Sequence, residues 1–112
     1  MIWLHLISYF FGGCFLCNAI PHFICGVMGR PFQSPFAKPP GEGLSTSTID
    51  VLWGFFNLVV AYLLLVRVGD FGLGSTPHMT ALGLGVLMIS LFGARHFGRF
   101  HGGNFPADSN AR

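Results

Sequence analysis

Residues 51–66 read VLWGFFNLVVAYLLLV, a stretch without a charged side chain between Asp50 and Arg67. A helix rises about 1.5 Å per residue and the hydrocarbon core of a bilayer is about 30 Å thick, so about 20 apolar residues are needed to cross it. Thr48 and the aliphatic stem of Arg67 extend the stretch toward that length. We therefore predict a transmembrane helix over residues 48–68.

The remaining charged residues leave two further gaps of this kind. Residues 1–29 and 71–94 also lack charged side chains, and a glycine-rich turn at the start of the second gap places a helix start near Pro77. We predict helices over residues 2–28 and 77–97. The expected fold class is an all-α membrane protein, a bundle of three transmembrane helices with a Pro/Phe-rich interfacial loop.

The composition agrees with a membrane protein and excludes several soluble classes. Of the 112 residues, 52% are hydrophobic and 9% are charged, whereas an ordinary soluble domain has roughly 25% charged residues. The chain is too apolar to be disordered, and three cysteines do not make a disulfide scaffold. We predict a single integral membrane domain over residues 1–112 with a polar tail over 102–112, and no nucleic-acid partner.

Local chemistry predicts where the second and third helices begin. Ser47 or Thr48 can cap the second helix, and Asp50 lies in its first turn, where the helix dipole favours a negative charge. Thr76 followed by Pro77 is typical of a helix start, with the threonine as cap and the proline as first helical residue.

Basic residues are distributed unevenly between the two sides that three helices imply. Arg67 is the one basic residue expected on the side of the N-terminus. The side shared by the first loop and the C-terminal tail holds the other five: Arg30, Lys38, Arg95, Arg99 and Arg112. Since cytoplasmic flanks carry an excess of Lys and Arg, we predict a multi-pass plasma-membrane protein with its N-terminus outside and its C-terminus in the cytoplasm.

The first loop repeats a Pro-Phe pair, at Pro31-Phe32 and again at Pro35-Phe36. Prolines disfavour a regular helix here. The two phenylalanines can anchor the loop in the headgroup region, where nearby Lys and Arg side chains meet anionic lipid. The alternative is a segment that docks a partner or folds back as a lid over the helix ends. We favour the anchoring interpretation.

Small and polar residues form stripes at helical spacing. Cys14, Asn18, Pro21 and Cys25 share one side of the first predicted helix. Such residues let helix backbones approach closely within a bilayer. On the second and third helices, the predicted packing residues are Gly54, Asn57, Ala61, Ala81 and Gly85.

Histidines and arginines gather at the predicted cytoplasmic boundary. The candidate ligand-binding residues are Asn18, His22, Arg30, Arg95, His96 and Arg99. Such a cluster can bind a lipid phosphate or another anion, and His22 can alternatively act as a general base. Interfacial side chains without a ligand are the structural alternative. No known catalytic motif accompanies the cluster, so catalytic residues stay unassigned.

Two patterns suggest a cofactor, but neither is complete. Cys14-x-x-Cys17 lacks a second such pair, and Cys25 supplies at most a third ligand. Histidines near both ends of the first and third helices would suit two haems, yet the two pairs lie about 26 Å apart along the axis, at the water boundaries. We predict no metal site and no cofactor.

Three segments carry a resemblance to a known group. They are Asn18-Ala-Ile-Pro-His-Phe23, Gly29-Arg-Pro-Phe-Gln-Ser-Pro-Phe36 and Ala94-Arg-His-Phe-Gly98, with Val51-Leu-Trp-Gly54 between the last two. The chain resembles small bacterial three-helix inner-membrane proteins that share the Asn-Ala-Ile-Pro-His-Phe motif. The resemblance implies a bacterial inner membrane and carries no activity.

Three classes of function remain open. We favour a non-enzymatic protein that packs against itself or against a larger membrane-protein partner. The second class is an oligomeric transport or permeation unit, although no acidic residue is expected at mid-membrane to couple ions. The third is an enzyme or an anion- or lipid-headgroup-binding protein at the cytoplasmic boundary. Membrane lipids are expected partners in every case.

Overall fold

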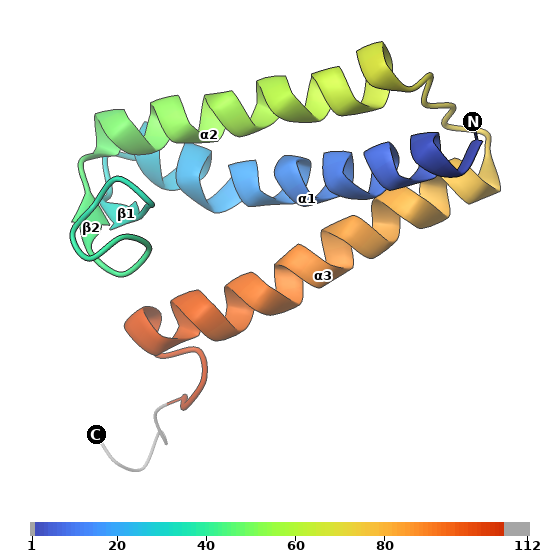
Figure 1. Ribbon diagram of the computed structural model, residues 1–112. Coiled ribbons are helices and arrows are strands. Elements are labelled where there is room, and N and C mark those ends of the chain that lie inside the picture. The colour runs from blue at the N-terminus through green and yellow to red at the C-terminus, as the bar shows by residue number, and fades with distance from the viewer. Residues whose placement is uncertain (1, 107–112) are drawn as a thin grey trace.

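The computed structural model describes residues 2–106 and is mostly helical (Figure 1). Along the chain the elements are α1 (Ile2–Val27), β1 (Phe32–Gln33), β2 (Leu44–Ser45), α2 (Ser47–Tyr62), the π-helix η1 (Leu63–Val68) and α3 (Thr76–His101). By length and composition, α1, α2 with η1, and α3 can each cross a membrane. The predicted membrane protein with three apolar helices is confirmed to this extent, while the short β1–β2 sheet makes all-α approximate.

The helix ends differ in detail from the sequence predictions. α3 continues to His101 rather than ending near residue 97, and it closes at Gly102, whose φ of 81° is a left-handed conformation that glycine favours. The helix therefore reaches the start of the predicted polar tail, which begins at Gly102. Residues 107–112, which include the predicted basic residue Arg112, lie outside the described part of the chain.

Both predicted helix caps are displaced by at least one residue. The Thr46 side chain accepts from the Ile49 amide at 3.3 Å, so the cap of α2 is neither Ser47 nor Thr48. Ser75 caps α3 in the same way, accepting from His78 N at 3.3 Å. In each case the hydroxyl residue that still has extended backbone can reach the free amides of the first turn, and the residues after it are already helical.

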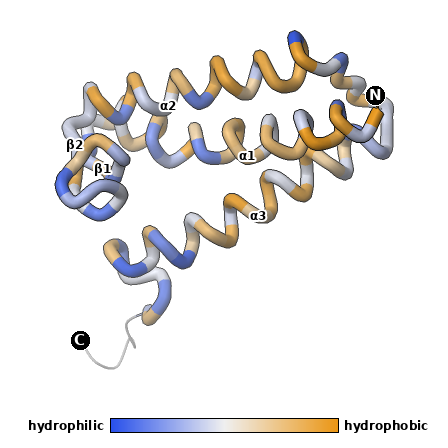
Figure 2. Tube along the Cα trace, viewed as in Figure 1, coloured by the Kyte–Doolittle hydropathy of each residue, from blue (hydrophilic) through white to orange (hydrophobic). Residues whose placement is uncertain are grey.

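α1 lies between the other two helices (Figure 1). α2 runs beside it over most of its length. α3 crosses α1 near the N-terminal part of α3 and then diverges, so that the two helices are splayed toward the end of α3 (Figure 1). Hydrophobic residues cover most of the three helices, whereas the β1–β2 loop and the end of α3 are more hydrophilic (Figure 2).

Glycines permit the close crossing of α1 and α3. A Cβ atom added at Gly85 would overlap the carbonyl oxygen of Phe10, and one added at Gly13 would overlap that of Leu82. Dispersion contacts between such closely placed backbones hold helices together where lipid removes the hydrophobic drive. The crossing point is therefore fixed by two residues without side chains.

The loop between α1 and α2 is tied to α2 by Asp50. Phe32 and Gln33 pair antiparallel with Ser45 and Leu44. The fully buried Asp50 accepts from the Phe32 amide at 2.9 Å, and Ser45 Oγ lies 2.6 Å from its other carboxyl oxygen. The carboxyl group thus holds both strands of the hairpin against the first turn of α2.

Replacing Asp50 by alanine should release this loop. The Phe32 amide would lose its acceptor in a buried position, which costs about 1–3 kcal/mol. We expect a lower melting temperature in detergent and faster hydrogen exchange at the Phe32 amide. Asp70→Ala, which removes an exposed carboxylate, is the control and should change neither. Unaltered exchange at Phe32 in Asp50→Ala would disprove the tie.

Glycine substitutions in α3 should differ sharply according to the face they occupy. Gly85→Ala inserts a methyl group against the Phe10 backbone and should lower thermal stability, because the helices must move apart. Gly83 has nothing within 4 Å of a built Cβ, so Gly83→Ala should be neutral or stabilising through its better helix propensity. Thermal unfolding of the two variants side by side checks this; equal effects would contradict the crossing geometry.

Candidate functional site

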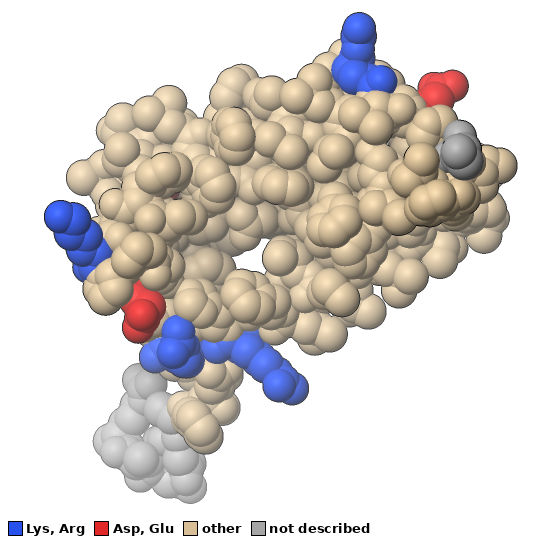
Figure 3. Space-filling model, viewed as in Figure 1, with Lys and Arg blue, Asp and Glu red and all other residues tan. Residues whose placement is uncertain are grey.

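A crevice opens where α3 diverges from α1 and α2. Figure 3 shows the molecule hollowed between α3 and the other helices, with the visible charged side chains toward the ends of the molecule and along the edge near the end of α3. Three hollows of about 460, 260 and 350 Å³ lie here, and Asn18 lines all of them. We use "crevice" for these three hollows together.

The largest hollow has apolar walls. The side chains that face it come from all three helices, and apart from two asparagines they are aromatic, aliphatic or sulfur-bearing. They are Phe10, Phe11, Cys14, Phe15, Asn18, Trp53, Asn57, Met88, Ile89 and Phe92. Such a lining suits hydrocarbon.

The crevice is closed toward the loop by polar contacts between the loop and α3. His96 Nε2 lies 2.6 Å from the Gly41 carbonyl oxygen, and His101 Nε2 lies 2.8 Å from Gln33 Oε1. Arg99 Nη2 lies 3.2 Å from His96 Nδ1. Because a guanidinium only donates, His96 Nδ1 accepts and its Nε2–H donates to Gly41, which specifies one neutral tautomer.

His22 lies at this closed end in an aromatic cage. It is 3% exposed. The ring centroids of Phe32, Phe97 and Trp53 lie 5.3, 5.8 and 6.3 Å from its own, all in edge-to-face arrangements. His22, Trp53, Phe97 and His96 line the 260 Å³ hollow together with loop residues. We call this hollow the polar end of the crevice.

An amide pair joins α1 to α2 beside the crevice. Asn18 Nδ2 donates to Asn57 Oδ1 at 3.0 Å, and Asn57 Nδ2 donates to the Trp53 carbonyl at 2.7 Å. Asn57 is completely buried. A hydrogen bond of this kind satisfies polar groups that lipid cannot satisfy.

The structure brings together only part of the predicted ligand-binding cluster. Asn18, His22 and His96 line the polar end. Arg99 reaches it indirectly, through His96. Arg30 and Arg95 are exposed and do not line it, because residues next to each other on a helix point about 100° apart and Arg95 therefore faces away from His96.

The predicted packing residues occupy two places. Gly54, Asn57 and Ala61 are buried, and a Cβ added at Gly54 would collide with the Phe23 backbone of α1. On α3, Gly85 is buried at the crossing and Ala81 is half-buried.

Sequence reasoning missed the residues that the loop and α2 supply. Gln33, Ser34 and Gly41 come from the loop, and Trp53 from α2. Trp53 had a signal, since a tryptophan near the start of a spanning helix is typical of the membrane interface. The loop residues had none, because their position depends on the fold of the hairpin.

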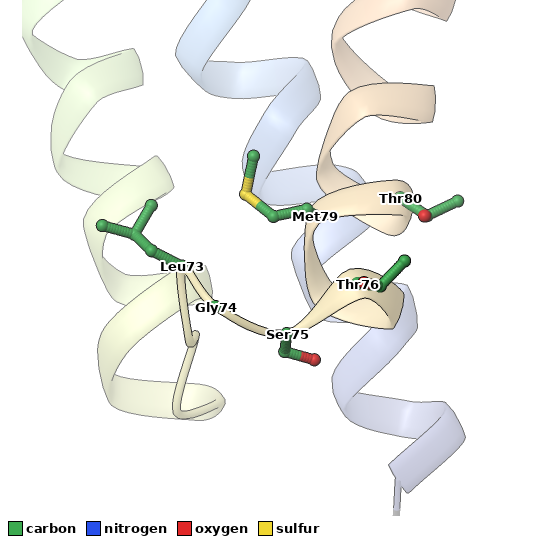
Figure 4. A pocket seen from close by; sticks show the side chains of 6 residues that line it. All are labelled: Leu73, Gly74, Ser75, Thr76, Met79 and Thr80. Atoms are coloured by element: carbon green, nitrogen blue, oxygen red, sulfur yellow. The ribbon is translucent and has the colours of Figure 1, made fainter.

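A shallow hollow of about 270 Å³ lies at the opposite end of the molecule, between the loop before α3 and the first turns of that helix (Figure 4). In this view Leu73 points toward α2 and Met79 toward α1, while Thr76 and Thr80 lie on the outer side. The Ser75 hydroxyl is engaged in capping α3. This hollow therefore has a weaker claim to a ligand than the crevice.

The other histidines and the cysteines have structural contacts. His78 Nδ1 accepts from the Gly72 amide at 3.0 Å, and Tyr9 packs on it at a centroid distance of 4.5 Å. Cys14 contacts the Gly85 carbonyl and Cys17 the Ser90 hydroxyl. Within residues 2–106, no group of three or more His, Cys, Asp or Glu side chains is placed to hold a metal ion.

No protein-family model, curated protein or solved structure matches the chain, so the site is interpreted from its own geometry.

The Asn18–Asn57 pair allows a quantitative test of the wall of the crevice. Asn18→Leu or Asn57→Leu alone leaves a buried amide without its partner, which costs about 1–3 kcal/mol. Asn18→Leu/Asn57→Leu removes both polar groups and should cost less than the sum of the single changes. Unfolding free energies of the four proteins in one detergent measure the coupling; strictly additive values would show that the pair does not interact.

Proposed function

We propose that this protein is a membrane-embedded binding protein that holds an amphiphilic lipid molecule in the crevice between α3 and the other helices. The observation that carries the proposal is the crevice itself, whose accessible surface is mostly apolar and which ends at the hollow where the His22 and His96 side chains lie. The chain of the ligand would lie along Phe15, Met88 and Ile89, and its polar part against His22 and His96.

Packing supports a ligand in this position. The hollows open to the outer surface of the bundle, so in a bilayer they would be filled by hydrocarbon. The close crossing at Gly85 fixes one end of the crevice, and the contacts of His96 and His101 with the loop hold α3 away from α1 at the other end. A lipid chain between the helices would restore the dispersion contacts that the splayed arrangement lacks.

The exposed arginines also fit the proposal, because they can contact lipid at the membrane surface, outside the crevice. Arg30, Arg95 and Arg99 lie outside the walls of the polar end, where their side chains can meet lipid phosphates at the membrane surface. We propose on this basis, and on the basic excess of this side, that the loop end faces the cytoplasm; the resemblance noted above adds the proposal that the membrane is a bacterial inner membrane. The N-terminus would then lie outside.

We now favour lipid binding over the partner-binding function that the sequence alone favoured. A protein that served only to pack against a partner would have no need of a crevice with a polar end inside its own bundle. Self-association or a larger partner would use the outer face of α3, and is compatible with a bound lipid.

Filling the crevice should displace the lipid. Ile89 lines two of the hollows, so Ile89→Trp would occupy the space of a hydrocarbon chain. Native mass spectrometry of the protein extracted gently from membranes should show a bound lipid, with its occupancy reduced several-fold in this variant.

Leu91→Trp is the matched control. Leu91 is on the same helix, is exposed, and lines none of the described hollows. Its lipid occupancy should equal that of the unaltered protein. A protein that emerges free of lipid, or equal occupancy in both tryptophan variants, would overturn the proposal.

A further inference from the structure

Two buried nitrogen atoms stand out in the described part of the chain because they have no hydrogen-bond partner. They are His22 Nδ1 and Trp53 Nε1. Both residues line the polar end of the crevice, and their ring centroids are 6.3 Å apart. Since buried polar groups are almost always paired, two unpaired groups at one hollow point to a ligand there.

The polar neighbours in this hollow are already engaged with other protein groups. Gln33 Oε1 is bound by His101, and the Gly41 carbonyl by His96. Asn18 donates to Asn57. The Ser34 hydroxyl accepts from the Phe36 amide at 3.2 Å. His22 Nδ1 and Trp53 Nε1 are therefore the two unpaired buried nitrogens of this lining, whose other polar side chains each make at least one hydrogen bond.

The indole N–H of Trp53 needs an acceptor because it can only donate. His22 Nδ1 donates in one neutral tautomer and accepts in the other. A carbonyl oxygen has two lone pairs and can accept from both. Both nitrogens are covered by neighbouring side chains in this structure, so a carbonyl oxygen in the hollow reaches them when those side chains move aside.

The charge around the hollow favours an uncharged acceptor. No Lys, Arg, Asp or Glu belongs to its described lining, and the guanidinium of Arg99 is bound to His96. An anion placed here would leave water without a cation beside it, which is costly in a site of low dielectric constant. A neutral carbonyl oxygen carries no such cost.

We propose that Trp53 and His22 recognise an uncharged carbonyl oxygen of a membrane-soluble ligand, with Trp53 Nε1–H donating to it. This rests on the proposed function, since the hydrocarbon part of the ligand lies in the crevice. The same chemistry is found in the ester of a neutral acyl lipid and in the ring of a quinone. The two sources are separated in the test.

The central comparison of the test is between two ligands that differ in one carbonyl group, and two further ligands vary the source of the carbonyl and the charge. Monooleoylglycerol has an ester carbonyl, and oleyl glyceryl ether has the same headgroup and chain length without it. Decylubiquinone presents a ring carbonyl, and oleoyl lysophosphatidate adds a charge. Affinities are measured with the full chain in detergent, in a Trp3→Phe background that leaves Trp53 as the one tryptophan; Trp3 is 58% exposed, and lines no hollow described above.

We expect monooleoylglycerol or decylubiquinone to bind about tenfold more tightly than the ether, a difference of about 1.4 kcal/mol. The stronger of the two identifies the source of the carbonyl. Trp53→Phe, measured by native mass spectrometry against the Trp3→Phe control, should abolish the preference over the ether, because carbonyl binding weakens more than ether binding. His22→Phe should also reduce the preference for the carbonyl ligand over the ether.

The remaining outcomes overturn the inference at different levels. Equal binding of ester, quinone and ether, or a preference that survives in Trp53→Phe, removes carbonyl recognition but leaves lipid binding in the crevice intact. If lysophosphatidate binds more tightly than the uncharged probes, the proposal that the ligand is uncharged is wrong. If no probe binds and no lipid is retained, the proposed function itself fails. The comparison of ligands on the Trp3→Phe protein stays decisive even if Trp53→Phe does not fold.

Discussion

The buried carboxyl group of Asp50 is the constraint on which the rest of the structure depends. It holds the Phe32 amide and the Ser45 hydroxyl against the first turn of α2, and so folds the loop back over the ends of the helices. The loop in turn supplies Gln33 and Gly41 to the histidines of α3. A single polar group in α2 thereby positions the loop that contacts the end of α3, a helix with which α2 has no extensive contact of its own.

The helices could be predicted from the sequence because a bilayer imposes a simple rule of length and polarity. Gaps between charges located all three, whereas their caps were missed because several hydroxyl residues stand together at each start. The hairpin could not be predicted. The two phenylalanines of the loop illustrate the reason: Phe32 is 8% exposed and Phe36 is 64% exposed, although their local sequences are alike. What separates them is the bond from Phe32 to Asp50, which no local pattern encodes.

The candidate site, too, could be predicted from the sequence only in part. Helical spacing placed Asn18, His22 and His96 toward one end of the bundle, and the structure puts them around one hollow. Charge alone suggested that the arginines would join them, but the angle between successive helical residues turns Arg95 outward, whereas Arg99, one turn beyond His96, reaches it. Trp53 enters the site only through the packing of α2 against α1, which depends on Gly54 and the asparagine pair.

The glycine crossing of α1 and α3 also limits how the molecule can move. Since backbone meets backbone at Gly13 and Gly85, the two helices cannot slide past one another there without a clash. The remaining freedom of α3 is rotation about that crossing point. The contacts of His96 and His101 with the loop oppose this rotation at the far end of the helix. Their loss would widen the crevice sideways, toward the lipid, rather than toward water.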